Sequence, residues 1–231
     1  MSGAPYRLKD DPYSSHSIIL GRLGEGRGRR ALDVGAADGY LAERLTAAGW
    51  KVTAVERDPA QAERAAARCE QAFTVDLERA LPPLAGQYDA IIYGDVVEHL
   101  SDPLRVMREV NRHLAPGALV VVSVPNVAHV WVRLSLLVGR FDYGDRGILD
   151  RTHLSFFTRR TFLSFLAAAG LVPREVAVTP VPLPVVVPAR FHGAALGVLH
   201  RLSAAAARLW PGGLAYQFVA VCAGARGDDR G

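Results

Sequence analysis

Residues 31–40, Ala-Leu-Asp-Val-Gly-Ala-Ala-Asp-Gly-Tyr, encode a strand, a tight turn and the start of a helix in immediate succession. A short apolar run contains Asp33. Gly35 and Gly39 follow this run, and an amphipathic run begins immediately after them. Glycines at such a turn let the backbone approach a ligand closely, and the first helical turn offers N–H groups without a partner in the helix. The segment therefore predicts a ligand-binding turn; on its own, an ordinary strand–helix turn is the alternative.

A second strand that ends in an acid follows about twenty residues later. It reads Val-Thr-Ala-Val-Glu and ends at Glu56. In nucleotide-binding α/β folds, a carboxylate at this place accepts hydrogen bonds from the two ribose hydroxyls. The first half of the chain is therefore predicted to bind a cofactor that contains a nucleoside.

The spacing of the glycines indicates which nucleoside cofactor this is. A dinucleotide fingerprint needs Gly-x-Gly-x-x-Gly, but counting from Gly35 the two later positions hold Ala37 and Tyr40. The spacing is instead Asp-x-Gly-x-x-x-Gly, which resembles motif I of the class I S-adenosylmethionine-dependent methyltransferases. The resemblance runs from about residue 30 to 125, and more loosely to the C-terminus. Many members carry glycine at the position of Ala37, so we expect this alanine to keep a negative φ.

Alternating apolar and amphipathic segments predict a doubly wound, mostly parallel α/β sheet of seven strands. The resemblance implies that the last strand is antiparallel. We interpret residues 1–231 as a single methyltransferase domain, with a cap insert at about 127–157 and a second insert at about 180–212. The strands are expected at 30–34, 51–56, 73–76, 88–93, 118–124, 174–178 and 216–222. The helices are expected at 13–23, 39–48, from Asp58, 101–114, 158–170 and 189–209.

Composition excludes several classes of protein. The 231 residues include 27 Lys and Arg against 23 Asp and Glu, a net charge of +4. This modest excess favours either an anionic, for instance phosphate-bearing, acceptor or a generic basic surface. No basic run interleaved with aromatic residues indicates nucleic-acid binding, and neither a secretory signal nor a bilayer-spanning apolar stretch is evident. Cys69 and Cys222 have no metal-ligand spacing, so we expect free thiols in a cytoplasmic protein.

The resemblance implies a role for each residue of the glycine turn. The backbone around Gly35, Ala36 and Ala37 is expected to approach the methionine part of S-adenosylmethionine. Asp33 suits its ammonium group, directly or through water. Gly39 completes the turn at the start of the helix.

Further cofactor contacts are expected along the ends of the next strands. Glu56 takes the ribose hydroxyls, and Arg57 flanks the adenine. Asp76 faces the adenine amino group, and Leu77 offers its backbone N–H to the ring. Open α/β sheets bind ligands at the carboxyl ends of their strands. By that rule the site also includes Gly94 and Asp95.

Two further motifs indicate a small-molecule acceptor. Residues 88–100, which end in Glu98, His99 and Leu100, and residues 123–126 are similar to segments of methyltransferases of the ubiquinone-biosynthesis type. Residues 139–158 resemble a subgroup often found with bacterial cell-surface sugar biosynthesis, which is an analogy of family alone.

Methyl transfer to a hydroxyl or carbon acid requires loss of a proton, and histidine is suited to accept one near neutral pH. We take His99, just past the fourth strand, and His153, in the cap insert, as the candidate bases. Asp142, Asp145 and Asp150 lie near His153 in sequence, but their spacing matches no Ca²⁺ loop. We therefore expect no metal.

The leading hypothesis is a methyltransferase that acts on oxygen, nitrogen or carbon of a sugar, polyketide-like or isoprenoid acceptor. The alternatives are a non-catalytic module that binds the nucleoside cofactor and an NAD-dependent oxidoreductase, which the absent dinucleotide fingerprint disfavours. The arginine-dotted apolar helix expected at 189–209 either covers the edge of the sheet or contacts a membrane surface. The sequence indicates neither the acceptor nor the oligomeric state.

Overall fold

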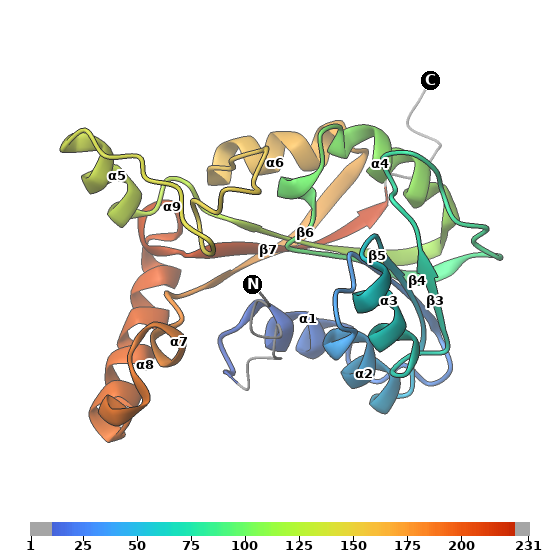
Figure 1. The fold of residues 1–231 in the computed structure, drawn as a ribbon, viewed down its shortest axis with the longest axis horizontal. Helices are drawn as coiled ribbons and strands as arrows, with labels where there is room; N and C mark the ends of the chain where they lie inside the picture. Colours follow the sequence, from blue (N-terminus) through green and yellow to red (C-terminus); the bar gives the residue numbers. More distant parts are fainter. Residues whose placement is uncertain (1–10, 225–231) are drawn as a thin grey trace.

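A seven-stranded sheet in the order β3-β2-β1-β4-β5-β7-β6 forms the centre of the computed structural model, which describes residues 11–224. Strand β7 runs antiparallel to both β5 and β6, and the other pairings are parallel. The sheet confirms the predicted doubly wound α/β fold with an antiparallel last strand (Figure 1). The strands are β1 (Arg30–Val34), β2 (Lys51–Glu56), β3 (Gln71–Thr74), β4 (Tyr88–Gly94), β5 (Leu114–Pro125), β6 (Leu171–Thr179) and β7 (Gln217–Gly224).

Helices cover both faces of this sheet. Figure 1 shows α1 (Ser15–Leu23), α2 (Tyr40–Ala47) and α3 (Pro59–Ala66) on one side, and α4 (Pro103–Val110) and α6 (Arg159–Ala168) on the other. The apolar run of β4 supplies both layers of the core. Ile91 and Tyr93 pack in the cluster that contains Met107 of α4 and Phe162 of α6, whereas Ile92 packs with α1 and α2. A parallel strand buried on both faces is expected to be apolar throughout.

Helix starts follow the capping chemistry visible in the sequence. Asp58 caps α3 by accepting a hydrogen bond from the Gln61 N–H, and Asp102 caps α4 in the same way. Thr158 begins α6 with a reciprocal capping box. Side-chain oxygens at these positions satisfy backbone N–H groups that the helix leaves without partners.

Several element boundaries differ from the prediction. The third strand ends at Thr74 rather than residue 76, so Asp76 lies in the following loop. The helix expected at 101–114 ends at Val110, followed by the 3-10 turn η2 (Asn111–His113) and by β5, which begins at Leu114. Strand β6 is longer than the predicted 174–178. These boundaries depend on pairing with neighbouring strands, which the local pattern does not contain.

The segment before β7 also differs from the single helix predicted at 189–209. It contains α7 (Leu183–Val186), the 3-10 turn η3 (Ala189–Phe191), α8 (Ala194–Leu209) and α9 (Pro211–Leu214). Proline at 188 and the extended backbone of Gly193 separate η3 and α8 from what precedes them. Over the described residues, no helix has the length and apolarity needed to cross a membrane.

The segment 127–157 leaves and rejoins the domain at one place. The Val127 N–H donates to the Phe157 carbonyl, and Asn126 and Phe157 form an isolated bridge. Within it, α5 (Val130–Leu137) is a helix that the sequence analysis did not predict. The far end of the segment returns to the sheet, where the N–H groups of Leu154 and Ser155 donate to the Glu98 carbonyl. This return places His153 beside the end of β4.

Candidate functional site

The turn after β1 and the loop after β4 touch at the carboxyl end of the sheet. Gly35 has a φ of 72°, and a Cβ atom added to it would lie 2.6 Å from Val96 Cγ2. A side chain at this position is therefore excluded both by conformation and by space. The close approach brings the predicted cofactor turn next to the 3-10 turn η1 (Val97–His99), which carries Glu98 and His99.

The expectation that Ala37 keeps a negative φ is wrong, because its φ is 47°. The Ala37 N–H donates to Glu56 Oε2 at 2.9 Å, so a carboxylate at the end of β2 fixes the turn in this conformation. Gly39, with a φ of 77°, then caps α2, and its missing side chain makes room for Ala65 of α3. The charge-assisted hydrogen bond from the Ala37 N–H to Glu56 thus offsets the conformational cost of a left-handed alanine.

We expect Ala37→Gly to stabilise the protein. The left-handed conformation costs an L-residue about 1–2 kcal/mol, and glycine removes this cost from the folded state. The extra conformational freedom of glycine in the unfolded chain offsets roughly half of the stability gained. A net gain of about 0.5–1 kcal/mol corresponds to a rise in Tm of roughly 1–4 °C for a chain of this size. Thermal unfolding without ligand measures the change.

Ala36→Gly is the matched control. Ala36 is buried against Ala54 and Ala65, and it is not among the residues with positive φ. Its replacement removes packing and adds freedom to the unfolded chain, so the Tm should fall. A fall in Tm for both variants would show that the left-handed alanine is not strained.

Asp33 is a buried acid near the end of β1, beside the predicted cofactor turn. Its side chain is 2% exposed, and its Oδ2 atom has no hydrogen-bond partner among the described residues. Burial, with a smaller contribution from the negative charge of Glu56, raises the pKa of Asp33 to about 7. A buried carboxylate without a counter-charge is costly. The ammonium group of S-adenosylmethionine is a cation that fits this requirement.

Glu56 holds the turn after β1 and the backbone after β2 by hydrogen bonds. Its Oε1 accepts from the backbone N–H groups of Arg57 and Asp58, and its Oε2 accepts from that of Ala37. The side chain is only 8% exposed. A carboxylate has about four lone-pair sites, so one remains for a ribose hydroxyl without any change in the turn. Arg57 is exposed beside it.

Asp76, which is predicted to face the adenine amino group, has other partners in this structure. Asp76 accepts from the Glu78 N–H and lies 3.3 Å from Arg79 Nε, and the Leu77 side chain packs in the main core. Asp95, with a φ of 54°, follows Gly94 at the end of β4. Its carboxylate accepts from the Ser123 hydroxyl at 2.6 Å and from the Gln217 amide at 2.9 Å. The adenine and strand-end contacts stay predictions, and Gln217 is a site neighbour that the sequence analysis missed.

Glu98, His99 and His153 form a compact cluster just past the end of β4. One ligand atom from each lies within 4.8 Å of the others, and the two imidazole rings are 4.7 Å apart in an edge-to-face arrangement. Glu98 is 1% exposed, and neither carboxylate oxygen has a hydrogen-bond partner in the described part of the chain. Burial, assisted by the nearby charge of Asp95, raises the pKa of Glu98 well above its usual value.

Hydrogen bonds orient both histidines. Nδ1 of His153 is 3.1 Å from the Ile148 carbonyl, and Nδ1 of His99 is 3.2 Å from the Thr152 carbonyl. Asp150 accepts from the Thr152 hydroxyl at 2.7 Å. Burial, together with the neighbouring His153, lowers the pKa of His99, so its neutral form prevails at pH 7.

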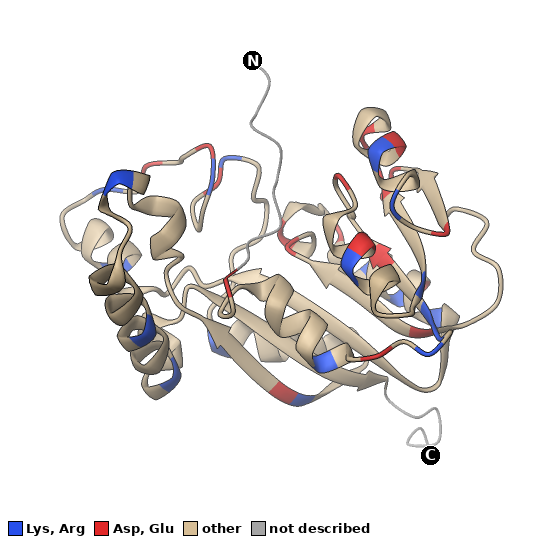
Figure 2. Cartoon of the chain, turned by 90° about the horizontal axis from the view of Figure 1, so that it is seen from below, with Lys and Arg blue, Asp and Glu red and all other residues tan. Residues whose placement is uncertain are grey.

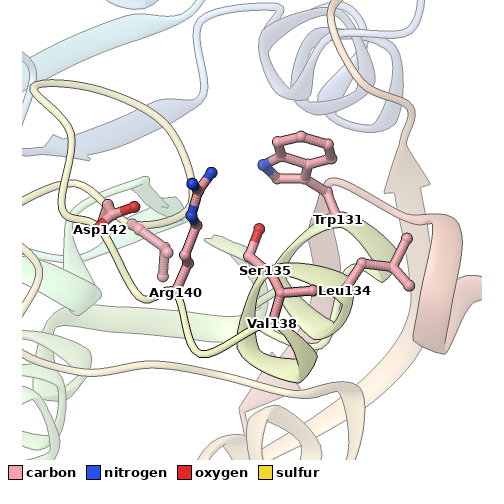
Figure 3. Close-up of a pocket in the computed structure, with 7 residues that line it drawn as sticks. Trp131, Leu134, Ser135, Val138, Arg140 and Asp142 are labelled. Atoms are coloured by element: carbon pink, nitrogen blue, oxygen red, sulfur yellow. The ribbon is translucent and has the colours of Figure 1, made fainter.

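The three aspartates of the 127–157 segment do not gather with one another. Asp145 pairs with Arg151 at 2.6 Å, whereas Asp150 holds Thr152. A cavity of about 350 Å³ also lies in this segment, over α5. Figure 3 shows the Arg140 side chain between Asp142 and Trp131 at this cavity. Its remaining lining residues are Leu134, Ser135, Val138 and Leu149.

Solved structures share this architecture. A methyltransferase from Archaeoglobus fulgidus described as SAM-dependent superposes with a TM-score of 0.60 at 14% identity, covering 90% of this chain and 93% of the other. A 1,6-didemethyltoxoflavin-N1-methyltransferase from Burkholderia thailandensis, solved with S-adenosylhomocysteine, gives a TM-score of 0.58 at 17% identity, covering 92% and 77%. The fold is therefore that of the Rossmann-like methyltransferases.

Residues 16–176, more than two thirds of the chain, match a family model described as a methyltransferase domain. The chain belongs to this family of methyltransferase domains. A curated relative, the ubiquinone biosynthesis O-methyltransferase of Caulobacter sp. (strain K31), is 35% identical over 115 residues, 46% of each chain. The chain thus spans about half the length of the curated relatives it matches.

Proposed function

We propose that the protein methylates an oxygen atom of a small-molecule acceptor, such as a sugar or another precursor of a cell-surface compound or secondary metabolite. The observation that carries the proposal is the His99–His153 pair at the end of β4, next to the glycine turn. Bound S-adenosylmethionine supplies an activated methyl group on a positive sulfur. The chain must then orient the acceptor, exclude water and accept its proton.

His99 is favoured over His153 as the proton acceptor. Its lowered pKa keeps the imidazole neutral, and the Nδ1 contact with the Thr152 carbonyl leaves Nε2 with a lone pair. His153 lies edge-on against it and is buried. The name of the Caulobacter relative, an O-methyltransferase, supports oxygen as the methylated atom.

The proposal places an anionic group of the acceptor at the cavity over α5. Arg140 lines this cavity, and no ion pair of its guanidinium is found among the described residues.

Peripheral contact with a membrane surface is part of the same proposal. Leu137 of α5 and Leu209 of α8 are 81% and 87% exposed, and α8 carries Arg201 and Arg208 without any acid. Figure 2 shows basic positions along the helix at one end of the molecule. Free thiols at both cysteines support a reducing cytoplasm.

We expect His99→Ala to reduce kcat by roughly 10²–10⁴-fold, the usual contribution of a positioned base. Methyl transfer from labelled S-adenosylmethionine to a panel of hydroxyl-bearing sugars and their phosphorylated forms measures it. S-adenosylhomocysteine affinity should change little, because His99 is not among the cofactor contacts. His192→Ala, at an exposed histidine near α8, is the control and should keep full activity. Equal turnover in both variants would contradict the proposed role of His99.

A further inference from the structure

We infer that Glu98, His99 and His153 bind a divalent transition-metal ion. These three side chains come from two segments that meet only in the folded chain, η1 and the end of the 127–157 segment. Their ligand atoms lie within 4.8 Å of one another, so small side-chain shifts bring all three within bonding distance of one ion. Only the role of the ion rests on the proposed function.

The carboxylate of Glu98 is the first line of argument. It is 1% exposed, and both of its oxygens lack hydrogen-bond partners in the part of the chain that the structure describes. Buried carboxylates are found paired with cations, hydrogen-bonded or bound to metal ions, because leaving both oxygens without a partner is expensive. The backbone of Glu98 is well held, since its carbonyl accepts from two N–H groups of the returning segment. An added cation would satisfy the two oxygens of this carboxylate.

The tautomers of the two histidines are the second line. A backbone carbonyl only accepts hydrogen bonds, so the Nδ1 atoms facing Ile148 and Thr152 must carry the protons. The neutral rings consequently keep a lone pair on Nε2. Metal-bound histidines typically donate their other N–H to a carbonyl or carboxylate in this way. The Thr152 hydroxyl lies 3.0 Å from the same Nδ1 of His99, and it donates a hydrogen bond to Asp150, which extends the support of His99 by one further residue.

The charges around the cluster are the third line. Asp95 and Asp150 both act electrostatically on Glu98, and His153 and Arg57 act on His99. With Glu98 ionised, three carboxylates contribute negative charge to the cluster. Asp95 is bound by Ser123 and Gln217, which are neutral. The surroundings therefore favour an added divalent cation.

The ligand types indicate the class of ion. Two imidazoles and one carboxylate suit Zn²⁺, Fe²⁺, Co²⁺ or Ni²⁺, whereas Ca²⁺ and Mg²⁺ prefer oxygen ligands alone. Three protein ligands leave at least one position open for another group. The predicted aspartates of the same segment are not part of this set, because Asp145 is paired with Arg151 and Asp150 with Thr152.

Within the proposed function, the open position receives the acceptor hydroxyl. The ion lowers the pKa of that hydroxyl, and its proton passes to solvent water. An oxygen lone pair then forms the bond to the methyl carbon while the carbon–sulfur bond breaks and its electron pair stays on sulfur. The products are the methylated acceptor and S-adenosylhomocysteine. In the metal-loaded protein both imidazoles are ligands, and the ion takes over the role of the histidine base.

Titration of chelator-treated protein with Co²⁺ tests the inference without any acceptor. We expect one Co²⁺ to bind per chain and to give a visible absorption, which disappears when Zn²⁺ replaces the bound Co²⁺. Glu98→Gln, which keeps the shape of the side chain, and His99→Ala should abolish this absorption. Thr152→Val should weaken binding by about 10–100-fold, as is usual when a supporting hydrogen bond to a ligand is lost. His192→Ala should bind as the unaltered chain does.

The outcomes separate this inference from the proposed function. The metal site is overturned if Co²⁺ does not bind, or if it binds equally well to a folded Glu98→Gln variant. In that case, methyl transfer that persists after chelation indicates that a histidine accepts the proton of the acceptor hydroxyl. Co²⁺ binding that is lost in Glu98→Gln, together with no methyl transfer to any acceptor, supports the site and rejects the proposed function. Circular dichroism of each variant shows whether it is folded.

Discussion

Glu56→Ala is expected to weaken S-adenosylhomocysteine binding by roughly 100-fold or more. Glu56 faces the predicted ribose position with one spare lone-pair site, and its Oε2 also holds the Ala37 N–H of the turn. Hydrogen bonds to charged groups contribute about 1.5–3 kcal/mol each, so losing the ribose contact and the ordered turn together accounts for this factor. Isothermal titration calorimetry with S-adenosylhomocysteine measures the change.

Two further variants separate binding from folding. Glu56 accepts three backbone hydrogen bonds, so its loss also lowers the Tm, and the titration must be done well below that temperature. Glu63→Ala removes an exposed glutamate from α3 and should leave the affinity unchanged. His99→Ala should change the affinity by less than about threefold, because a base that acts only on the acceptor adds nothing to cofactor binding. A larger loss for His99→Ala than for Glu56→Ala would mean that the cofactor lies elsewhere.

The strands and the cofactor turn were predictable because their signals are local. Gly35, Gly39 and Glu56 lie at positions where the sequence itself shows the end of a strand or the start of a helix, and the structure gathers them at the turn after β1. The sign of φ at Ala37 was not predictable, since it depends on the bond between its N–H and Glu56. The excluded volume at Gly35 likewise depends on Val96, which belongs to another strand connection.

The histidine cluster was predictable only in part. His99 and His153 were each chosen from their own segments, but their contact depends on the return of residues 150–155 to the Glu98 carbonyl. Glu98 was noted only as part of a motif, and nothing local shows that both of its oxygens are buried without partners. The sequence distance between Thr152 and His99 is 53 residues, which local periodicity does not bridge. Long-range packing therefore decides the chemistry of this cluster.

The stability of the ligand-free protein should depend on pH through Asp33. Its folded pKa is raised to about 7, by burial and by Glu56, from an unfolded value of 3.8. The folded state therefore holds a proton that the unfolded chain has already lost, so this group makes stability fall as pH rises from about 4 to 7. At about 1.4 kcal/mol per pKa unit, the loss approaches roughly 4 kcal/mol above pH 7. Asp33→Asn should remove it, so that denaturant unfolding at pH 8 shows a variant more stable than the parent.

The affinity for S-adenosylhomocysteine should change with pH in the opposite direction. The ammonium of the ligand requires an ionised Asp33, so binding below pH 7 must first release the proton from this carboxyl. Affinity should fall by about tenfold per pH unit below 7 and be level above it. Asp33→Asn should bind weakly at every pH and show no such slope, which calorimetry between pH 5.5 and 8.5 can measure. A parent affinity that is level across this range would mean that Asp33 does not meet the ammonium, and its burial would then have to be explained by the fold alone.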